Sequence, residues 1–546
     1  MLAVVVVTCL AVLASGRQAD GLTLGEPGRA SDKVGAALQD EDLYSIPQGF
    51  LLGAGVSACQ AEGAWDADGK AESVLDRMAH VKNNPVFHSS PDVSSNHYHR
   101  YKEDLAMAKD MKFTSHRFSI SWSRVLPKGD TSHVNQEGVR FYHDYIDEIK
   151  RLGMEPMVTM LHFDQPYTLE VETGGWTKPA MVDKYVEYAG FLFAEFGSKV
   201  KYWTTVNEPN MYCNYFPTVM NLSGLAPKDD MNIYKCMHNM VIAHMKTYRL
   251  YKEKYYKDQQ GFVGTSALLW PSIPATTSAE DVVAADTFNT VFAGTVLHPL
   301  VYGDYPPLTR YIVDSRSKAL GLAESRLPEF TPEEKEQLVG TTDFIALNVY
   351  SSFVAAYDLD GSGGEVTPAL LGPIMDDMAF LKLSGGMASF NTTDASMMRT
   401  TLLWAWNAYH VPIVIAENGF GDMTGVGLRD SARSVYHSSN LRSLLQTMKQ
   451  FDVKVIAYYV WALLDVFEFS AGYDERPFGL IQVDYKDASL KRTLKDSSQF
   501  FVEIGNTGRV PYIAPPLNSA SGVQHVCSWL MLSISFLVVN SRFPYF

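Results

Sequence analysis

The sequence predicts a (β/α)8 barrel, and two observations lead to that fold class. Short apolar or β-branched runs alternate with longer amphipathic segments, and the alternation continues from residue 46 to residue 512 without a repeat or a low-complexity linker. Runs of this kind are typical of buried parallel strands, which are apolar on both faces. Eight of them separated by helices favour a closed barrel over a doubly wound sheet. We expect strands at residues 50–56, 114–121, 156–161, 200–206, 262–266, 344–348, 412–416 and 453–461.

The segments between these runs predict the helices of the barrel. Residues 101–111 and 138–152 repeat apolar side chains at helical spacing. The stretch 358–391 contains Gly and Pro, so we expect loops there that cover the mouth of the barrel and shape a pocket. One large barrel with insertions accounts for most of the 546 residues, and we place it at 46–512.

Both ends of the chain carry apolar segments that predict processing. Residues 2–13 are small or apolar and precede Ala14-Ser-Gly16, which predicts a signal peptide over 1–16; an uncleaved anchor is the alternative. The tail at 518–546 begins with small residues and contains an apolar run at 526–539, which resembles a lipid-anchor signal. A retained tail or a packed terminus stays open beside that reading.

Composition and charge restrict the partners. Hydrophobic residues make up 46% of the chain and charged residues 20%, which is typical of a globular protein. A formal charge of -15 argues against a nucleic-acid partner, because binding phosphates requires clustered Lys and Arg. The acidic surface identifies no other partner, and the oligomeric state stays open.

The cysteines and two glycosylation sequons indicate the secretory pathway. Among the three cysteines outside the terminal segments, we expect Cys213 to pair with Cys236, because both follow one motif closely, and Cys59 to stay free. No pair has the spacing of a zinc site, so we expect no metal. The sequons at Asn221 and Asn391 would be usable in an enzyme that is secreted or anchored at the extracellular face of a membrane.

Two carboxylates carry the candidate chemistry. Trp203-Thr-Thr-Val-Asn-Glu-Pro209 ends the fourth run with Glu208, and Ile413-Val-Ile-Ala-Glu-Asn-Gly419 ends the seventh with Glu417. A barrel places its active site at the carboxyl ends of its strands, and strands four and seven face each other across the mouth. Glycoside hydrolysis needs such a pair of carboxyl groups. A single glutamate of this kind is more often a solvated loop acid, but the pair favours a catalytic site.

Five ordered motifs carry a resemblance to a known family. They are Ser57-Ala-Cys-Gln-Ala-Glu-Gly63, His116-Arg-Phe-Ser-Ile-Ser-Trp-Ser-Arg124, Thr205-Val-Asn-Glu-Pro209, Ala416-Glu-Asn-Gly419 and Trp461-Ala-Leu-Leu-Asp465. With them the chain resembles glycoside hydrolase family 1, the β-glucosidase-like enzymes, over 46–512. The resemblance implies a (β/α)8 catalytic domain that needs no cofactor. It also implies hydrolysis of a β-glycoside or oligosaccharide with retention of configuration, through a covalent glycosyl-enzyme.

The resemblance also implies roles for the residues at the strand ends. Glu208 matches the general acid/base, which must keep its proton until the aglycone leaves, and Glu417 matches the nucleophile, which must be ionised to attack. Arg117 and Tyr350 match the donors that contact the nucleophile. Asn348 matches a residue at the same rim, which supports the nucleophile region or a substrate hydroxyl.

A second group matches the sugar ligands. Gln60, His162 and Asn207 match residues that bind sugar hydroxyls, with Asn207 on the 2-OH. Trp461 matches the aromatic platform under the sugar ring. Glu468 matches the carboxylate that binds the 4-OH and 6-OH. Because a negative charge there would repel a 6-phosphate, an unphosphorylated sugar is expected.

Four positions depart from the family pattern. Phe469 and Phe163 stand where Trp is usual, so two indole donors are missing and recognition of the 3-OH or 4-OH is relaxed or rebuilt. Cys59 replaces a common Tyr, and Pro477 interrupts the segment before Phe478. None of them is part of the carboxylate pair.

The same residues leave three other functions open. A thioglucosidase of the animal type keeps both carboxylates, whereas the plant type replaces the acid/base with Gln and does not match Glu208. Transglycosylation would use the same covalent intermediate. A catalytically inactive glycan-binding protein on this fold would typically lose one carboxylate, and both Glu208 and Glu417 are present here.

Overall fold

The computed structural model describes residues 43–515, apart from 85, 226–231, 359–373, 386–395, 423–424, 470 and 474. Except for Leu43, the described residues belong to one compact unit, Tyr44–Phe546. The predicted signal peptide at 1–16, the tail at 518–546 and the sequon at Asn391 lie outside the described residues. Among the helices that the structure describes, none is both long enough and apolar enough to cross a membrane.

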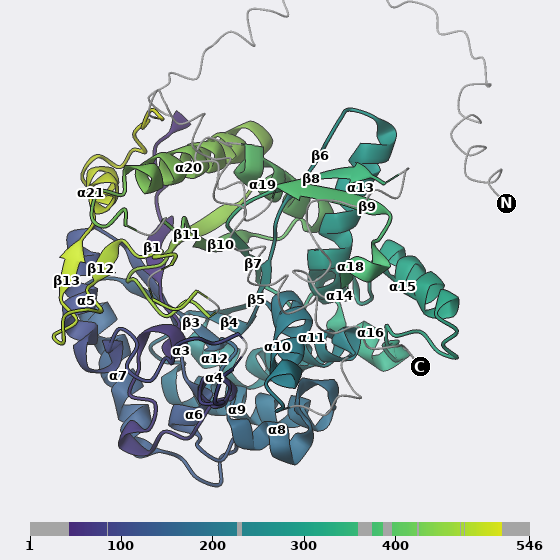
Figure 1. Ribbon diagram of the computed structural model, residues 1–546, viewed down its shortest axis with the longest axis horizontal. Coiled ribbons are helices and arrows are strands. Elements are labelled where there is room, and N and C mark those ends of the chain that lie inside the picture. Colours follow the sequence, from purple (N-terminus) through teal and green to yellow (C-terminus); the bar gives the residue numbers. More distant parts are fainter. Residues whose placement is uncertain are drawn as a thin grey trace, which may run out of the picture. The chain divides into compact units, whose positions relative to one another are not determined.

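The unit is built on a closed barrel of parallel strands (Figure 1), in the order β1-β11-β10-β7-β5-β4-β3-β2. Each of the eight expected strands overlaps one barrel strand, which confirms the predicted fold class. The strands are β1 (Leu51–Gly55), β2 (Ser115–Ser119), β3 (Glu155–Leu161), β4 (Tyr202–Asn207), β5 (Phe262–Leu268), β7 (Phe344–Val349), β10 (Ile413–Asn418) and β11 (Val455–Trp461).

Helices connect the strands and surround them. The larger ones are α5 (His97–Asp110), α7 (Gln136–Arg151), α9 (Ala180–Phe196), α10 (Pro209–Leu222), α11 (Ile233–Leu250), α13 (Ala279–Asn289), α15 (Pro307–Ala319), α19 (Ser396–Tyr409), α20 (Ser431–Phe451) and α21 (Ser498–Thr507). In α7 the buried residues Tyr142, Tyr145 and Ile149 recur at helical spacing, and Glu137 in the first turn and Arg151 in the last complement the helix dipole. The expected helices 101–111 and 138–152 coincide with α5 and α7.

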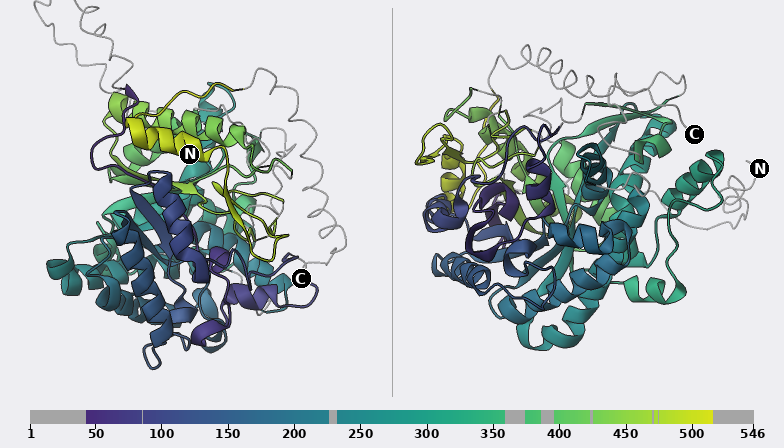
Figure 2. Two further views of the ribbon diagram at one scale, coloured as in Figure 1. Left: turned by 90° about the vertical axis from the view of Figure 1, so that its left-hand side faces the viewer. Right: turned by 60° about the horizontal axis from the view of Figure 1, so that its bottom comes forward.

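Shorter helical segments complete the connections. They are α3 (Ala58–Ala61), η1 (Ala67–Gly69), α4 (Val74–Ala79), α6 (Trp122–Val125), α8 (Tyr167–Thr173), η2 (Gly175–Thr177), η3 (Tyr251–Tyr255), α12 (Tyr256–Gln259), η4 (Thr290–Gly294), α14 (Thr295–Tyr302), α16 (Pro332–Leu338) and α18 (Ile374–Asp377). Figure 2 shows α21, in yellow, lying beside α20 in green, and the rings of His437 and Phe501 join these two helices with centroids 5.3 Å apart.

Two small sheets outside the barrel were not expected from the sequence. One contains β6 (Ser272–Pro274), β8 (Phe353–Tyr357) and β9 (Leu381–Gly385), and the other pairs β12 (Ile481–Val483) with β13 (Arg492–Leu494). The expectation of loops over 358–391 was therefore wrong for β9 and α18. These elements are too short for their periodicity to be read from the sequence, and they depend on pairing with distant segments.

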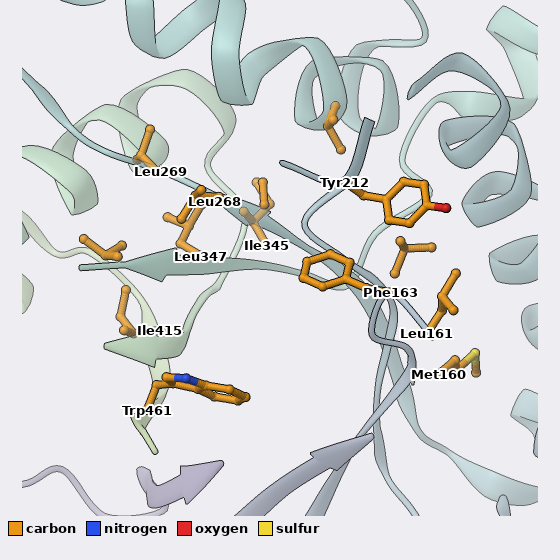
Figure 3. Close-up of a cluster of buried hydrophobic side chains, with 14 of the residues drawn as sticks. Met160, Leu161, Phe163, Tyr212, Leu268, Leu269, Ile345, Leu347, Ile415 and Trp461 are labelled. Atoms are coloured by element: carbon orange, nitrogen blue, oxygen red, sulfur yellow. The ribbon is translucent and has the colours of Figure 1, made fainter. Parts of the chain in front are cut away.

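The apolar core has two parts. The larger part fills the space between strands and helices, and Figure 3 shows some of its side chains near the strand ends. The smaller part lies inside the barrel and contains Met157, Phe344, Ala346, Val414, Ala416, Ala457 and Tyr459.

Two glycines in the barrel strands allow neighbouring strands to approach closely. A Cβ on Gly53 would lie 2.2 Å from the Ser115 carbonyl oxygen, and one on Gly264 would lie 2.4 Å from that of Phe344.

Two barrel strands lose their regular register near their carboxyl ends. The pairing of β4 with β5 shifts between Thr204 and Asn207, and the pairing of β10 with β7 shifts between Ile415 and Glu417. Such irregularities turn a side chain away from the regular alternation of a strand. Both of them lie just before the candidate catalytic glutamates.

A disulfide joins Cys213 in α10 to Cys236 in α11, as predicted, and Cys59 is free. The bond closes a loop between two cysteines that are 23 residues apart in the sequence, next to the segment that carries Glu208. Because the bond limits the freedom of the unfolded chain, a loop of this length stabilises the fold by about 3 kcal/mol.

We predict that the Cys213→Ala/Cys236→Ala variant has a lower thermal midpoint than the wild type. The measurement is thermal denaturation followed by circular dichroism, with Cys59→Ala as the matched control that removes a cysteine outside the bond. Reduction of the wild type by dithiothreitol should lower the midpoint in the same way. If full reduction, verified by thiol titration, leaves the midpoint unchanged, the disulfide contributes no stability.

Candidate active site

The strand-end residues predicted from the sequence come together at the carboxyl ends of the barrel strands. Glu208, Glu417 and Asn207 are almost fully buried there, and Arg117 and Asn348 lie beside them. Hydrogen bonds connect all five residues with one another, either directly or through a shared neighbour. A carboxylate pair that the sequence separates by about two hundred residues thus shares one site.

Glu208 owes its position to the turn between β4 and α10. Its backbone is left-handed (φ 47°, ψ 60°), and Pro209 starts α10 directly after it. A non-glycine residue in this conformation costs roughly 1–2 kcal/mol and is found where function requires it. The Glu208 amide donates to the Ser266 carbonyl at 2.9 Å, which holds the turn against β5.

Glu417 is held by two charged or polar donors. The Arg117 guanidinium on β2 donates to Oε1 at 2.6 Å, and the Tyr350 hydroxyl after β7 donates to Oε2. Arg117 is 1% exposed and Glu417 3%, so water competes little for this ion pair. Both contacts fix the orientation of the carboxylate.

Two asparagines connect the two glutamates. Asn348 Nδ2 donates to Glu208 Oε1 at 2.6 Å and to Asn207 Oδ1 at 3.1 Å, while the Ser266 hydroxyl donates to Asn348 Oδ1 at 2.8 Å. Arg117 donates a second bond, 2.8 Å long, to the same Asn207 oxygen. The sequence singled out Asn348 but not Ser266, although Ser266 ends a predicted strand and could have been found by that placement.

Glu208 has a strongly perturbed pKa. Burial raises the pKa of Glu208 to about 8, and the Glu417 charge adds to the rise, whereas the Asn348 amide and the Arg117 charge oppose it. At neutral pH the Glu208 carboxyl therefore keeps its proton, while Arg117 and Tyr350 donate hydrogen bonds to Glu417. Such a site can donate a proton to one atom of a ligand and attack another.

Gln60, Trp461 and Glu468 form a second polar group at the same mouth. Gln60 Nε2 donates to the Phe467 carbonyl at 2.9 Å and lies 3.4 Å from Glu468 Oε2, while Trp461 Nε1 lies 3.4 Å from Glu468 Oε1. The Ser57 hydroxyl, which the sequence analysis did not single out, donates to Gln60 Oε1 at 2.7 Å.

Desolvation raises the pKa of the Glu468 carboxyl to about 8. The hydrogen bond from Trp461 opposes that rise, and the charges of Glu417 and Asp465 add to it. Near neutral pH this carboxyl can therefore donate as well as accept a hydrogen bond.

His162 lies between the two groups. Its Nε2 accepts a hydrogen bond from the Asn207 amide at 3.2 Å, so its proton is on Nδ1, which has no hydrogen-bond partner among the described residues. Burial and the charge of Arg117 hold the pKa of His162 well below its usual value, which keeps the ring neutral. The ring stacks on Trp461 with centroids 5.6 Å apart.

A cluster of aromatic rings forms the wall beside His162. Figure 3 shows Phe163 and Trp461 extending toward one another across the strand ends, with Tyr212 behind Phe163. Phe163 also contacts Phe216 and Phe469, with ring centroids 4.9 Å and 5.8 Å away. Phe469 is half-buried, whereas Phe163 is 4% exposed. The phenylalanine rings of this wall therefore offer a ligand no hydrogen-bond donor.

The sequon residue Asn221 is half-buried in the last turn of α10. Ser223 of the same sequon donates to the Val219 carbonyl at 2.7 Å and accepts from Asn84 at 2.9 Å. The structure thus places this sequon in an ordered helix end.

Comparisons with known proteins agree with this geometry. The model of glycosyl hydrolase family 1 matches residues 43–509. Myrosinase 1 of Brevicoryne brassicae is 35% identical over 472 residues, covering 85% of this chain and 99% of that protein. Beta-glucosidase 11 of Arabidopsis thaliana is 35% identical over 494 residues, covering 84% of this chain and 91% of that protein.

A solved structure of aphid myrosinase is similar over nearly the same part of the chain. It superimposes with a TM-score of 0.77 at 34% identity and covers 85% of this chain and 100% of its own. By its family model, its relatives and its eight-stranded barrel, this chain belongs to glycosyl hydrolase family 1 and is a retaining β-glycosidase.

Proposed function

We propose that Glu208 is the general acid/base and Glu417 the nucleophile. The observation that carries the assignment is their different surroundings. Glu208 has a raised pKa and keeps a proton to give, whereas Glu417 receives hydrogen bonds from Arg117 and Tyr350. A retaining glycosidase needs a proton donor and an ionised nucleophile in these positions.

In the first step a Glu417 oxygen attacks the anomeric carbon. The bond from that carbon to the aglycone oxygen breaks, and the Glu208 proton moves to the leaving oxygen. In the second step water attacks the same carbon, gives its proton to Glu208 and releases Glu417. Arg117 and Tyr350 orient the carboxylate and balance its charge before attack and after release.

We propose that the second polar group binds the sugar. His162 Nδ1 offers an unused donor, and Gln60 and Glu468 offer polar atoms beside it. Asn207 lies between Arg117 and His162, where it can bind the 2-OH, and Asn348 keeps Glu208 in place. The Trp461 indole provides a flat apolar surface for the C–H face of the ring.

The sugar class follows from the charges around Glu468. Glu468 carries no positive charge in either protonation state, and the Glu417 and Asp465 charges act on it together with the opposing charge of Arg476. We therefore propose an unphosphorylated β-glucoside or a related β-glycoside as substrate. Because the Phe163 and Phe469 rings lack donors, discrimination at C3 or C4 rests on fewer hydrogen bonds.

Thioglucoside hydrolysis is the second candidate, and one observation favours it. The name myrosinase is carried both by a protein of similar sequence and by a solved structure of similar fold. A thiolate leaves without much help from a proton, so this activity would depend less on Glu208.

We propose that the enzyme works outside the cytosol, secreted or anchored at the extracellular face of a membrane. The buried Cys213–Cys236 disulfide supports this compartment, because such bonds persist in oxidising surroundings. The signal peptide at 1–16, the glycosylation of Asn221 and Asn391, and a lipid anchor replacing the tail are parts of the same proposal. Release of activity from membranes by a phosphatidylinositol-specific phospholipase would separate an anchored enzyme from a secreted one.

We predict that Glu417→Ala lowers kcat on a nitrophenyl β-glucoside by at least about 10⁴-fold, because no covalent intermediate can form. Added azide should restore turnover and yield the α-glycosyl azide, since the anion attacks from the side that Glu417 occupied. The product configuration is read by proton NMR. Recovery of the β-azide would assign the nucleophile to another residue.

We predict that Glu208→Ala slows substrates with poor leaving groups by about 10²–10⁴-fold and activated dinitrophenyl glycosides far less, because only the former need the proton. In the wild type, kcat/KM on unactivated substrates should fall as the pH rises through about 8, where Glu208 loses its proton. With the activated substrate, this alkaline decline should be absent from Glu208→Ala. Equal losses on both classes of leaving group would contradict the role.

We predict that Phe469→Trp raises the preference for a glucoside over its C4 or C3 epimer by about tenfold in kcat/KM, the effect of one added hydrogen bond. Phe469→Leu is the matched control, since it removes the ring without adding a donor, and it should not raise the preference. A thioglucoside in the same panel tests the second candidate, which requires turnover at least as efficient as that of the oxygen glucoside.

A further inference from the structure

A buried hydrogen-bonded chain connects helix α20 to the residues that hold Glu417. His437 Nδ1 lies 2.8 Å from the Tyr458 hydroxyl, and that hydroxyl contacts Asn418 Oδ1. Asn418 Nδ2 lies 2.9 Å from the Tyr436 hydroxyl, which lies 2.7 Å from the Tyr350 carbonyl oxygen. His437, Tyr458 and Asn418 are 0% exposed and Tyr436 2%, so water does not interrupt the chain.

The Tyr350 carbonyl oxygen, at the end of the hydrogen-bonded chain, determines the direction of every hydrogen bond in it. A carbonyl oxygen cannot donate, so the Tyr436 hydroxyl must donate to Tyr350, and its oxygen is left to accept from the Asn418 amide. The Asn418 carbonyl oxygen then accepts from Tyr458, whose single proton is used in that bond. The remaining bond requires His437 Nδ1 to be the donor.

The surroundings of His437 agree with that tautomer. Its Nε2 is buried and has no hydrogen-bond partner among the residues that the structure describes, as expected of the nitrogen without a proton. Burial and the charge of Arg433 hold the pKa of His437 well below its usual value, so the imidazole stays neutral. A neutral ring with its proton on Nδ1 starts the chain with a fixed donor.

The chain lies where the barrel loses regular hydrogen bonds. The register of β10 shifts against both neighbours between Ile415 and Asn418, so Glu417 sits in an irregular stretch. Asn418 Nδ2 donates to the Val349 carbonyl at 2.6 Å as well as to Tyr436, and Tyr436 donates to the next carbonyl along. Two consecutive carbonyl groups at the end of β7 are therefore held by side chains.

We propose that His437 and Tyr436 are positioning residues for catalysis. Tyr436 holds the Tyr350 carbonyl group, and His437 acts on it through Tyr458 and Asn418. The Tyr350 hydroxyl in turn binds Glu417. The proposal rests on the proposed role of Glu417 as the nucleophile. A small shift of the Tyr350 backbone would move its hydroxyl away from the carboxylate and misalign the attack, and an error of about 1 Å can cost 10²-fold in rate.

The matched pair His437→Asn and His437→Leu tests the donor at the start of the chain. The Asn amide nitrogen can occupy the place of ring Nδ1, whereas Leu has the same shape without a donor. We expect kcat of His437→Leu to fall by about tenfold with KM within about twofold, because alignment in the transition state is affected and binding is not. His437→Asn should retain most of the wild-type kcat.

A second variant addresses the same chain at its other end. Tyr436→Phe removes the donor to Tyr350 and should also lower kcat by about tenfold at nearly constant KM. If His437 acts through the chain, adding His437→Leu to Tyr436→Phe should cost less than about twofold more, because both changes break the same path. Circular dichroism at the assay temperature checks that each variant is folded.

Three results would overturn the proposal. They are equal kcat for the Asn and Leu variants, a loss that appears in KM alone, and additive losses in the double variant. A separate control tests the proposed catalytic role of Glu417. An inactive wild type, or full activity of Glu417→Ala, would contradict that role and not the positioning proposal. If only the His437 and Tyr436 variants behave like the wild type, the positioning proposal fails while the catalytic assignment stands.

Discussion

The central constraint in this structure is that two carboxyl groups share one buried site and cannot both be charged at low cost. Burial raises the pKa of Glu208 and the nearby Glu417 charge adds to that rise, so Glu208 retains its proton at neutral pH. The different roles proposed for Glu208 and Glu417 thus rest on burial and on unequal donors. Arg117 and Tyr350 serve one carboxylate, and the Asn348 amide serves the other.

The barrel brings the two carboxyl groups together through irregular backbone at the ends of two strands. β4 ends in a left-handed Glu208 with Pro209 after it, and β10 changes register just before Glu417. A strictly regular strand would alternate its side chains between the barrel interior and the surrounding helices. The irregular ends give up some backbone pairing and require side chains such as Asn418 to replace the missing contacts.

Much of this arrangement could be predicted from the sequence, because the features involved are local. Most barrel strands are apolar or β-branched runs, and Glu208 and Glu417 end two such runs within dense motifs. The β6-β8-β9 sheet could not be predicted in this way, since strands as short as Ser272–Pro274 form only through distant partners. Tyr436 and His437 were likewise not found from the sequence, because the strand ends that they bind lie far from most of α20 in the chain.

The interior glycines limit how this enzyme can diversify. At Gly53 and Gly264 the neighbouring strand leaves no room even for a methyl group. Neither position can accept a larger side chain. The aromatic wall at the rim offers more freedom for new specificity, since Phe469 there is partly open to solvent.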